Sequence, residues 1–135
     1  MIDYKLHIPG PVNVSSEVYK AMTNPVMGHR STDFVDLYSQ CQPLLKNLFQ
    51  TEDPVFLSTS SAWGVMEGAI RNLTNRKTLC CTCGAFSDKW IDVARRCGKE
   101  ADELSAEWGS HISPEKLDAF LSTGDYDLVT LVHNE

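Results

Sequence analysis

Two short segments of the chain combine small residues with groups suited to hold a phosphorylated ligand. The first is Ser58 to Gly64, in which Ser60 and Ser61 stand where we expect a strand to give way to a helix. The first turn of a helix presents unpaired backbone N–H groups and a partial positive charge, so it can hold a phosphate. Either serine could instead serve only as the cap of the helix, which is the common use of a hydroxyl residue there.

The second segment, Cys83 to Trp90, also lies between an expected strand and an expected helix. Gly84 and Ala85 would let a ligand approach the backbone closely, and the ring of Phe86 could lie flat against an aromatic ligand. Phe86 could equally be an ordinary core residue, since phenylalanine is often buried. Together the two segments predict a site for a flat phosphorylated ring, a combination more specific than either segment alone.

Other reactive side chains are less informative. His29 and Arg30 form an adjacent pair suited to anion binding, because arginine grips a carboxylate at two points, but a solvated loop explains the pair as well. Cys80 and Cys83 form a Cys-x-x-Cys pair that could bind zinc or act in redox chemistry, yet zinc needs about four ligands and no second pair exists. Residues three apart on a strand face opposite ways, so buried free thiols are the better interpretation.

Alternating strands and helices must position these segments. We expect helices over 62–73, 87–97 and 114–121, and strands over 55–57, 78–82, 100–105 and 128–132. Ser113 and Gly98 should mark a helix start and a helix end, respectively. The strand at 78–82 lacks polar alternation, as expected when both faces of a sheet are covered. The pattern predicts an α/β fold, with a mostly parallel sheet and helices on both faces.

The first fifty residues have a different pattern. Residues 1–14 read as an extended arm, because Pro9-Gly10-Pro11 cannot continue a helix or a central strand. A short helix capped by Ser15 should end near Met22. A long helix should follow over 33–50, with Pro43 bending it or starting a second segment.

Composition limits the class of protein. The 135 residues carry a formal charge of -6, which argues against a nucleic-acid partner, because such proteins usually show a clustered basic face. The N-terminus lacks an apolar signal-peptide core, and no apolar run is long enough to span a membrane. Five cysteines without such a signal predict reduced thiols and a cytoplasmic location.

Several sequence blocks occur in the order seen in class V aminotransferases, and the chain resembles that family over essentially its whole length. The similarity is greatest to the alanine/serine–glyoxylate and phosphoserine-like branch. The blocks are Pro9–Val14, Gly28–Ser31, Ser60–Glu67, Gly84–Trp90, Glu107–Gly109 and His133–Glu135. The resemblance implies the fold-type I architecture, a pyridoxal 5'-phosphate cofactor and a homodimer. It also implies two domains: an N-terminal arm and helical segment over 1–50, and the truncated first part of the cofactor-binding α/β large domain over 51–135.

The resemblance further implies roles for individual residues. Those expected to bind the cofactor, at its phosphate or by stacking of the aromatic ring on its pyridine, are Ser60, Ser61, Ala62, Trp63 and Phe86. Those expected in a substrate or interface loop are Pro9, Gly10, Pro11, His29 and Arg30. Trp63 departs from the family, where threonine or histidine is usual; an indole has only one N–H, so it could turn away and leave the backbone N–H to bind.

The resemblance also implies what is missing. In the family the Schiff-base lysine, the aspartate that pairs with the pyridine nitrogen and the substrate-binding arginine all come later in the sequence. We therefore expect part of an enzyme that moves an amino group from a small amino acid to a 2-oxo acid such as glyoxylate or pyruvate, with no catalytic residue in this chain and no activity by itself. The alternatives are a non-catalytic cofactor-binding or subunit-pairing fragment, or a related lyase or desulfurase.

Overall fold

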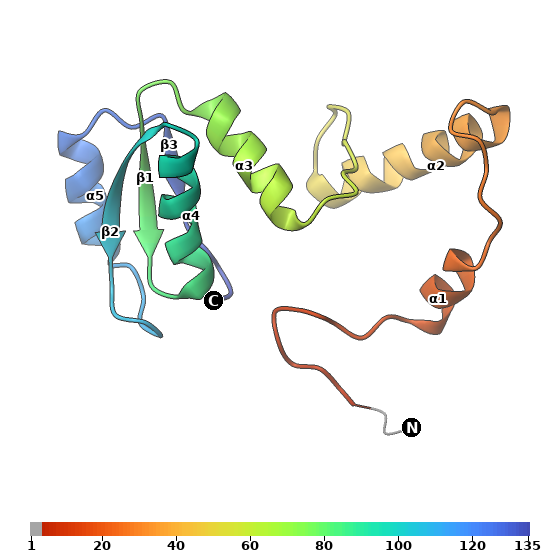
Figure 1. Ribbon diagram of the computed structural model, residues 1–135, viewed down its shortest axis with the longest axis horizontal. Coiled ribbons are helices and arrows are strands. Elements are labelled where there is room, and N and C mark those ends of the chain that lie inside the picture. Colours follow the sequence, from red (N-terminus) through yellow and green to blue (C-terminus); the bar gives the residue numbers. More distant parts are fainter. Residues whose placement is uncertain (1–3) are drawn as a thin grey trace. The chain divides into compact units, whose positions relative to one another are not determined.

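The computed structural model describes residues 4–135 and contains five helices and three strands (Figure 1). Their contacts divide the chain into two compact units, Met1–Ser58 and Thr59–Glu135. No helix among residues 4–135 is long and apolar enough to cross a membrane. In chain order, the elements are α1 (Ser16–Met22), α2 (Thr32–Phe49), α3 (Ala62–Leu73), β1 (Lys77–Thr82), α4 (Ala85–Arg96), β2 (Glu100–Ser105), α5 (Pro114–Thr123) and β3 (Leu128–Thr130).

Local capping signals define both helices of the first unit. The Ser15 hydroxyl accepts a hydrogen bond from the Val18 N–H at the start of α1, as predicted. The Ser31 hydroxyl accepts one from the Phe34 N–H (3.2 Å) at the start of α2. Helix α2 continues through Pro43 as one element, so the alternative of a second segment starting there is wrong. None of the described residues 4–58 is buried.

The strand predicted over 55–57 does not form, which corrects the sequence interpretation. The N–H of Val55 donates to Oε1 of Gln42 (3.1 Å), and its carbonyl accepts from Nε2 of the same amide (2.8 Å). A side-chain amide therefore takes the place that a neighbouring strand would occupy. Phe56 is 85% exposed, so the apolar run that suggested a buried strand is not buried here.

The second unit contains a parallel sheet in the order β2-β1-β3, which confirms the predicted α/β fold with a parallel sheet. Leu79 of β1 lies opposite Asp102 of β2 and Val129 of β3. β2 has the predicted bounds, whereas β3 ends at Thr130 and is two residues shorter than expected.

Residues of the central strand alternate between two cores. Cys80 packs with Ile70 of α3 and with α4, through Trp90, Ile91 and Ala94. Leu79 and Cys81 pack on the other face with Leu104, and with Leu117 of α5. Helices therefore cover both faces of the sheet, as predicted, with α3 and α4 on one face and α5 on the other. Each large buried apolar side chain contributes roughly 1.5–3 kcal/mol.

The boundaries of the helices of the second unit follow the sequence signals closely. Helix α3 has the predicted bounds, and Val65 and Leu73 on it are 59% and 55% exposed. Its face toward α4 and the sheet contains Trp63 and Ile70, which their spacing of seven residues places on one side of the helix. Helix α4 starts two residues before the prediction and is followed by Gly98 in a left-handed conformation (φ 69°), the expected stop.

Polar contacts near the start of β1 join β1 to β2 and to Tyr126, which precedes β3. The Tyr126 hydroxyl donates to Asp102 (2.7 Å), and the Lys77 ammonium lies 3.1 Å from the same carboxylate oxygen. The hydrogen bond to Asp102, supported by partial burial, raises the pKa of Tyr126 to about 12. The bonds from Tyr126 and Lys77 in turn lower the pKa of Asp102.

Candidate functional site

The loop between β1 and α4 is fixed by a buried serine. The Ser87 hydroxyl, fully buried, accepts hydrogen bonds from the N–H groups of Cys83 (2.8 Å) and Gly84 (3.0 Å). It lies 3.1 Å from the Gly84 carbonyl, to which it donates. These bonds satisfy backbone groups in a sharp turn, where unpaired buried polar atoms would be costly, and they hold the residues before Phe86 in one conformation.

The carboxylate of Glu135 caps the same helix. It accepts hydrogen bonds from the N–H of Phe86 (2.5 Å) and the N–H of Ser87 (3.1 Å). Partial burial works to raise the pKa of Glu135, but the hydrogen bonds from Ser87 and the Phe86 amide outweigh it and lower the pKa below its usual value. The start of α4 thus already holds a negative charge supplied by the chain itself.

Phe86 projects from this first turn and is 44% exposed. The interpretation that it is an ordinary core residue is therefore wrong. The backbone N–H of Phe86 is held by Glu135, while much of the residue remains accessible to solvent.

The start of α3 differs from that of α4. Its cap residue, Ser61, makes no capping hydrogen bond with its side chain, so the simple role of a side-chain cap is not what the structure shows. The Ser60 hydroxyl donates to the Ser61 carbonyl (2.9 Å). A Cβ at position 64 would lie 2.6 Å from the Ser60 oxygen, so Gly64 allows that hydroxyl to lie against the first turn of α3.

The indole of Trp63 points toward α4. Its ring packs edge-on against Trp90, with centroids 5.6 Å apart, and the Lys89 ammonium lies 5.3 Å from its centroid. The ring is therefore engaged by α4, as the sequence interpretation allowed, while the Trp63 backbone belongs to the first turn of α3. This contact joins the first turn of α3 to the middle of α4.

The predicted site residues are divided between the two units. The five predicted to bind the cofactor, Ser60, Ser61, Ala62, Trp63 and Phe86, all belong to the second unit, where Trp63 connects α3 to α4. The arm and loop residues belong to the first unit and are exposed there: Pro9, Gly10, Pro11, His29 and Arg30. Their role remains a prediction.

Sequence reasoning missed Glu135 and Ser87 as structural partners of Phe86. Ser87 could have been found, because a hydroxyl three residues after Gly84 has the spacing of a helix cap contact. Glu135 lies 49 residues from Phe86 in the chain, so only the rule that parallel strands end at the same edge pointed toward it.

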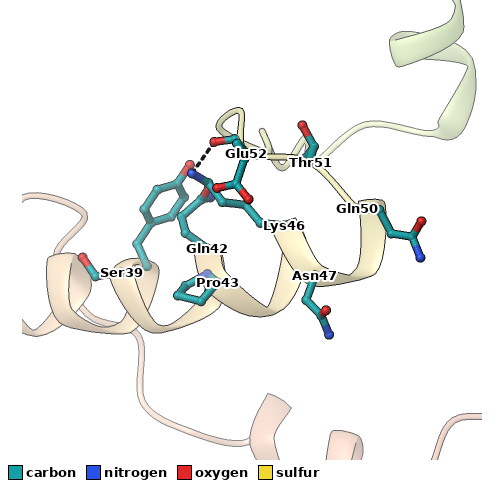
Figure 2. A pocket seen from close by; sticks show the side chains of 9 residues that line it. Ser39, Gln42, Pro43, Lys46, Asn47, Gln50, Thr51 and Glu52 are labelled. Carbon is teal, nitrogen blue, oxygen red and sulfur yellow. Dashed lines mark hydrogen bonds between the residues drawn. The ribbon is translucent and has the colours of Figure 1, made fainter.

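Each of the two units contains a cavity, and the one in the second unit is lined in part by Glu135. One of about 820 Å³ in the first unit is lined by α2 and the loop after it, where Lys46 donates to the Glu52 carbonyl (2.6 Å) (Figure 2). None of the predicted site residues lines it. A second, of about 370 Å³, lies beside α5 and is lined in part by Cys81, Cys83 and His133.

The cysteines do not gather at one place. All five have free thiols. Cys80 packs in the core on the α4 side, whereas Cys83 lines the cavity on the α5 side. Within residues 4–135 there is no group of three or more histidine, cysteine or acidic side chains that could hold a metal ion.

Most of the known proteins found to be similar to this chain are named as aminotransferases, and two are named as soluble hydrogenase subunits. No protein-family model matches the chain. An uncharacterized aminotransferase of Methanocaldococcus jannaschii is 38% identical over 133 residues, and the serine–glyoxylate aminotransferase of Methylorubrum extorquens is 36% identical over 136 residues. Each alignment covers 96% of this chain and 34% of the relative. Among solved structures, the ureidoglycine–glyoxylate aminotransferase of Bacillus subtilis superposes with a TM-score of 0.81 at 26% identity, covering 94% of this chain and 34% of that one.

The chain is thus an aminotransferase homologue with the α/β fold of part of a pyridoxal-phosphate-dependent transferase domain. More particularly, its relatives include aminotransferases named for serine, aspartate and alanine with glyoxylate. The chain spans about a third of the length of the curated relatives it matches.

Proposed function

We propose that this chain is part of a class V aminotransferase that uses pyridoxal 5'-phosphate to move an amino group from a small amino acid to a 2-oxo acid such as glyoxylate or pyruvate. We further propose that the whole enzyme is a cytoplasmic homodimer. The glyoxylate aminotransferases among its relatives support this substrate class.

The observation that carries the proposal is the contrast between the start of α4 and the start of α3. The amides at the start of α4 are held by Glu135, beside an exposed Phe86 ring. The start of α3 has two serines, and its cap side chain makes no capping bond. A doubly charged phosphate could bind at the start of α3, and a flat ring could stack on Phe86.

Each part of the cofactor would have its own protein group. The N–H groups of Ala62 and Trp63 would bind the phosphate, with hydroxyls from Ser60 and Ser61. Phe86 would cover one face of the pyridine ring. When bound, pyridoxal phosphate carries the amino group and withdraws electrons from the substrate; these residues orient it and exclude water from its covered face.

We propose that no lysine of the second unit binds the cofactor covalently. Lys89, on the first turns of α4, has its ammonium against the Trp63 ring, and Lys77 pairs with Asp102 at the other end of the sheet. We therefore propose that the isolated chain binds the cofactor without covalent attachment and does not transaminate alanine or serine with glyoxylate.

Fluorescence titration with pyridoxamine 5'-phosphate tests the binding part, since this form cannot react with surface lysines. We expect saturable binding, weakened roughly three- to tenfold by Phe86→Ala, because an aromatic pair is worth about 0.5–1.5 kcal/mol. Phe56→Ala, at an exposed position in the first unit, is the matched control. Absence of binding, or equal affinity of the two variants, would contradict the proposal.

A further inference from the structure

A carboxylate belonging to the chain occupies the start of α4, and α3 is a second helix of the same unit. At α4, Glu135 accepts from the N–H groups of Phe86 and Ser87. At α3, the cap residue Ser61 makes no side-chain capping bond. Each of these two helices carries a partial positive charge at its amino-terminal end. Without Glu135, an external anion would therefore have two helix starts to bind.

We propose that Glu135 is a specificity-determining residue: a built-in anion that closes the start of α4 to phosphate and holds the backbone of Phe86 so that its ring stays exposed. An external phosphate is thereby directed to the start of α3. The part concerning α3 rests on the proposed function, whereas the occupation of α4 by Glu135 does not.

The shape of Gly84 supports a dedicated place for this carboxylate. Gly84 is buried and fully extended (φ 178°, ψ -173°), a conformation that any residue can adopt. A larger residue at position 84 would lack space, because its Cβ would overlap the Cγ and carboxylate of Glu135. The Ser87 hydroxyl also holds the Gly84 N–H (3.0 Å), so the loop cannot readily move to make room.

The geometry around the Glu135 carboxylate favours its charged form. The carboxylate lies against the amides of α4, and its neighbours in the cavity beside α5 include His111, His133 and Cys83. Two amide donors at 2.5 and 3.1 Å stabilise the charged form. A bound phosphate would use the same amide donors, so Glu135 and an external anion compete for one place.

An amide NMR titration with inorganic phosphate tests the proposal without any cofactor. In the unmodified chain we expect the Phe86 and Ser87 signals to stay in place. In the Glu135→Ala variant the same two signals should move with phosphate. The affinity of these amides for phosphate should be at least roughly tenfold above that in the unmodified chain, since the opened helix start recovers about 1.4 kcal/mol. Equal movement in both proteins, or none in the variant, would overturn the proposal. A residue that only stabilises the fold would not create a new anion site when removed.

Gly84→Ala provides an independent test, because it leaves the carboxylate intact but removes its space. Gly84→Ala should lower the unfolding midpoint of the chain and have little effect in the Glu135→Ala background, so the two changes are not additive. Additive effects of the two changes on the unfolding midpoint would show that Gly84 and Glu135 do not share one contact, and would contradict the proposal. Should Glu135→Ala fail to fold, Glu135→Ser, whose side chain is too short to reach the amides of α4, takes its place in the phosphate titration, with the same two outcomes.

The failures of the two proposals can be told apart. If pyridoxamine phosphate does not bind the unmodified chain, the proposed function is wrong, while the response of the α4 amides in Glu135→Ala still decides the role of Glu135. If those amides do not respond, the role of Glu135 is wrong, while cofactor binding that depends on Phe86 would still stand.

Discussion

The two units of this chain obtain their structure from different sources. In the first, residues 4–58 form two capped helices without a single buried side chain, and Leu44 and Leu48 of α2 are 73% and 72% exposed. In the second, five of the six residues of β1 are buried, and helices cover both faces of the sheet. Local sequence signals are thus enough to define helices, whereas strands and a core require residues far apart in the chain.

The largest expected effect is on the core of the second unit. Ile70→Ala should reduce the free energy of unfolding of that unit by about 2–5 kcal/mol, because Ile70 is fully buried between α3, α4 and the sheet. Denaturant unfolding followed by tryptophan fluorescence would measure it, since Trp63 and Trp90 lie in the same cluster.

A matched change in the first unit gives the contrast. Leu44→Ala removes a side chain that is 73% exposed, so its effect should stay within about 0.5 kcal/mol. A loss as large as that of Ile70→Ala would show that α2 is packed against something, and the difference between the units would disappear.

The next effect is on ionisation at the amino-terminal end of the sheet. The pKa of Tyr126, about 12 because of its hydrogen bond to Asp102, lies above the unfolded value of about 10. A raised pKa stabilises the fold below pH 10, and this contribution is lost as the pH rises from about 10 to 12. The ultraviolet difference between the unmodified chain and Tyr126→Phe should titrate near pH 12, and Asp102→Asn should shift it downward. An unshifted titration in Asp102→Asn would contradict the assignment.

The smallest effects concern the helix caps. Ser31→Ala removes a side chain that accepts the Phe34 N–H, so it should cost about 0.5–2 kcal/mol of helix stability. Ser61→Ala should cost little, because the Ser61 side chain makes no capping bond, yet it should weaken pyridoxamine phosphate binding if the proposed function holds. Circular dichroism at 222 nm compares the two, and equal losses of helix would refute the distinction.

Features of the fold that depend on local signals could be predicted from the sequence, whereas those that depend on contacts between distant residues could not. The caps at Ser15 and Ser113 and the stop at Gly98 are local signals, and each marks the helix end that was expected. The segment at 55–57 has strand-like residues, but a strand needs a neighbour, and Val55 is paired with the Gln42 side chain instead.

The candidate site shows the same limit. Serines and an aromatic at two helix starts could be recognised from residue type, as could the fact that Trp63 is poorly suited to bind phosphate through its side chain. That Glu135 lies against Phe86, or that Trp63 packs on Trp90, depends on the folding of three strands together and could not be read from either segment.

The two adjacent cysteines of β1 allow the opening of the second unit to be followed by thiol alkylation. Cys80 and Cys81 are buried on opposite faces of the strand, and burial raises the pKa of both thiols. Because only the thiolate reacts with alkylating reagents, neither thiol should react until β1 separates from the sheet. The rate of their alkylation therefore reports the opening of the second unit.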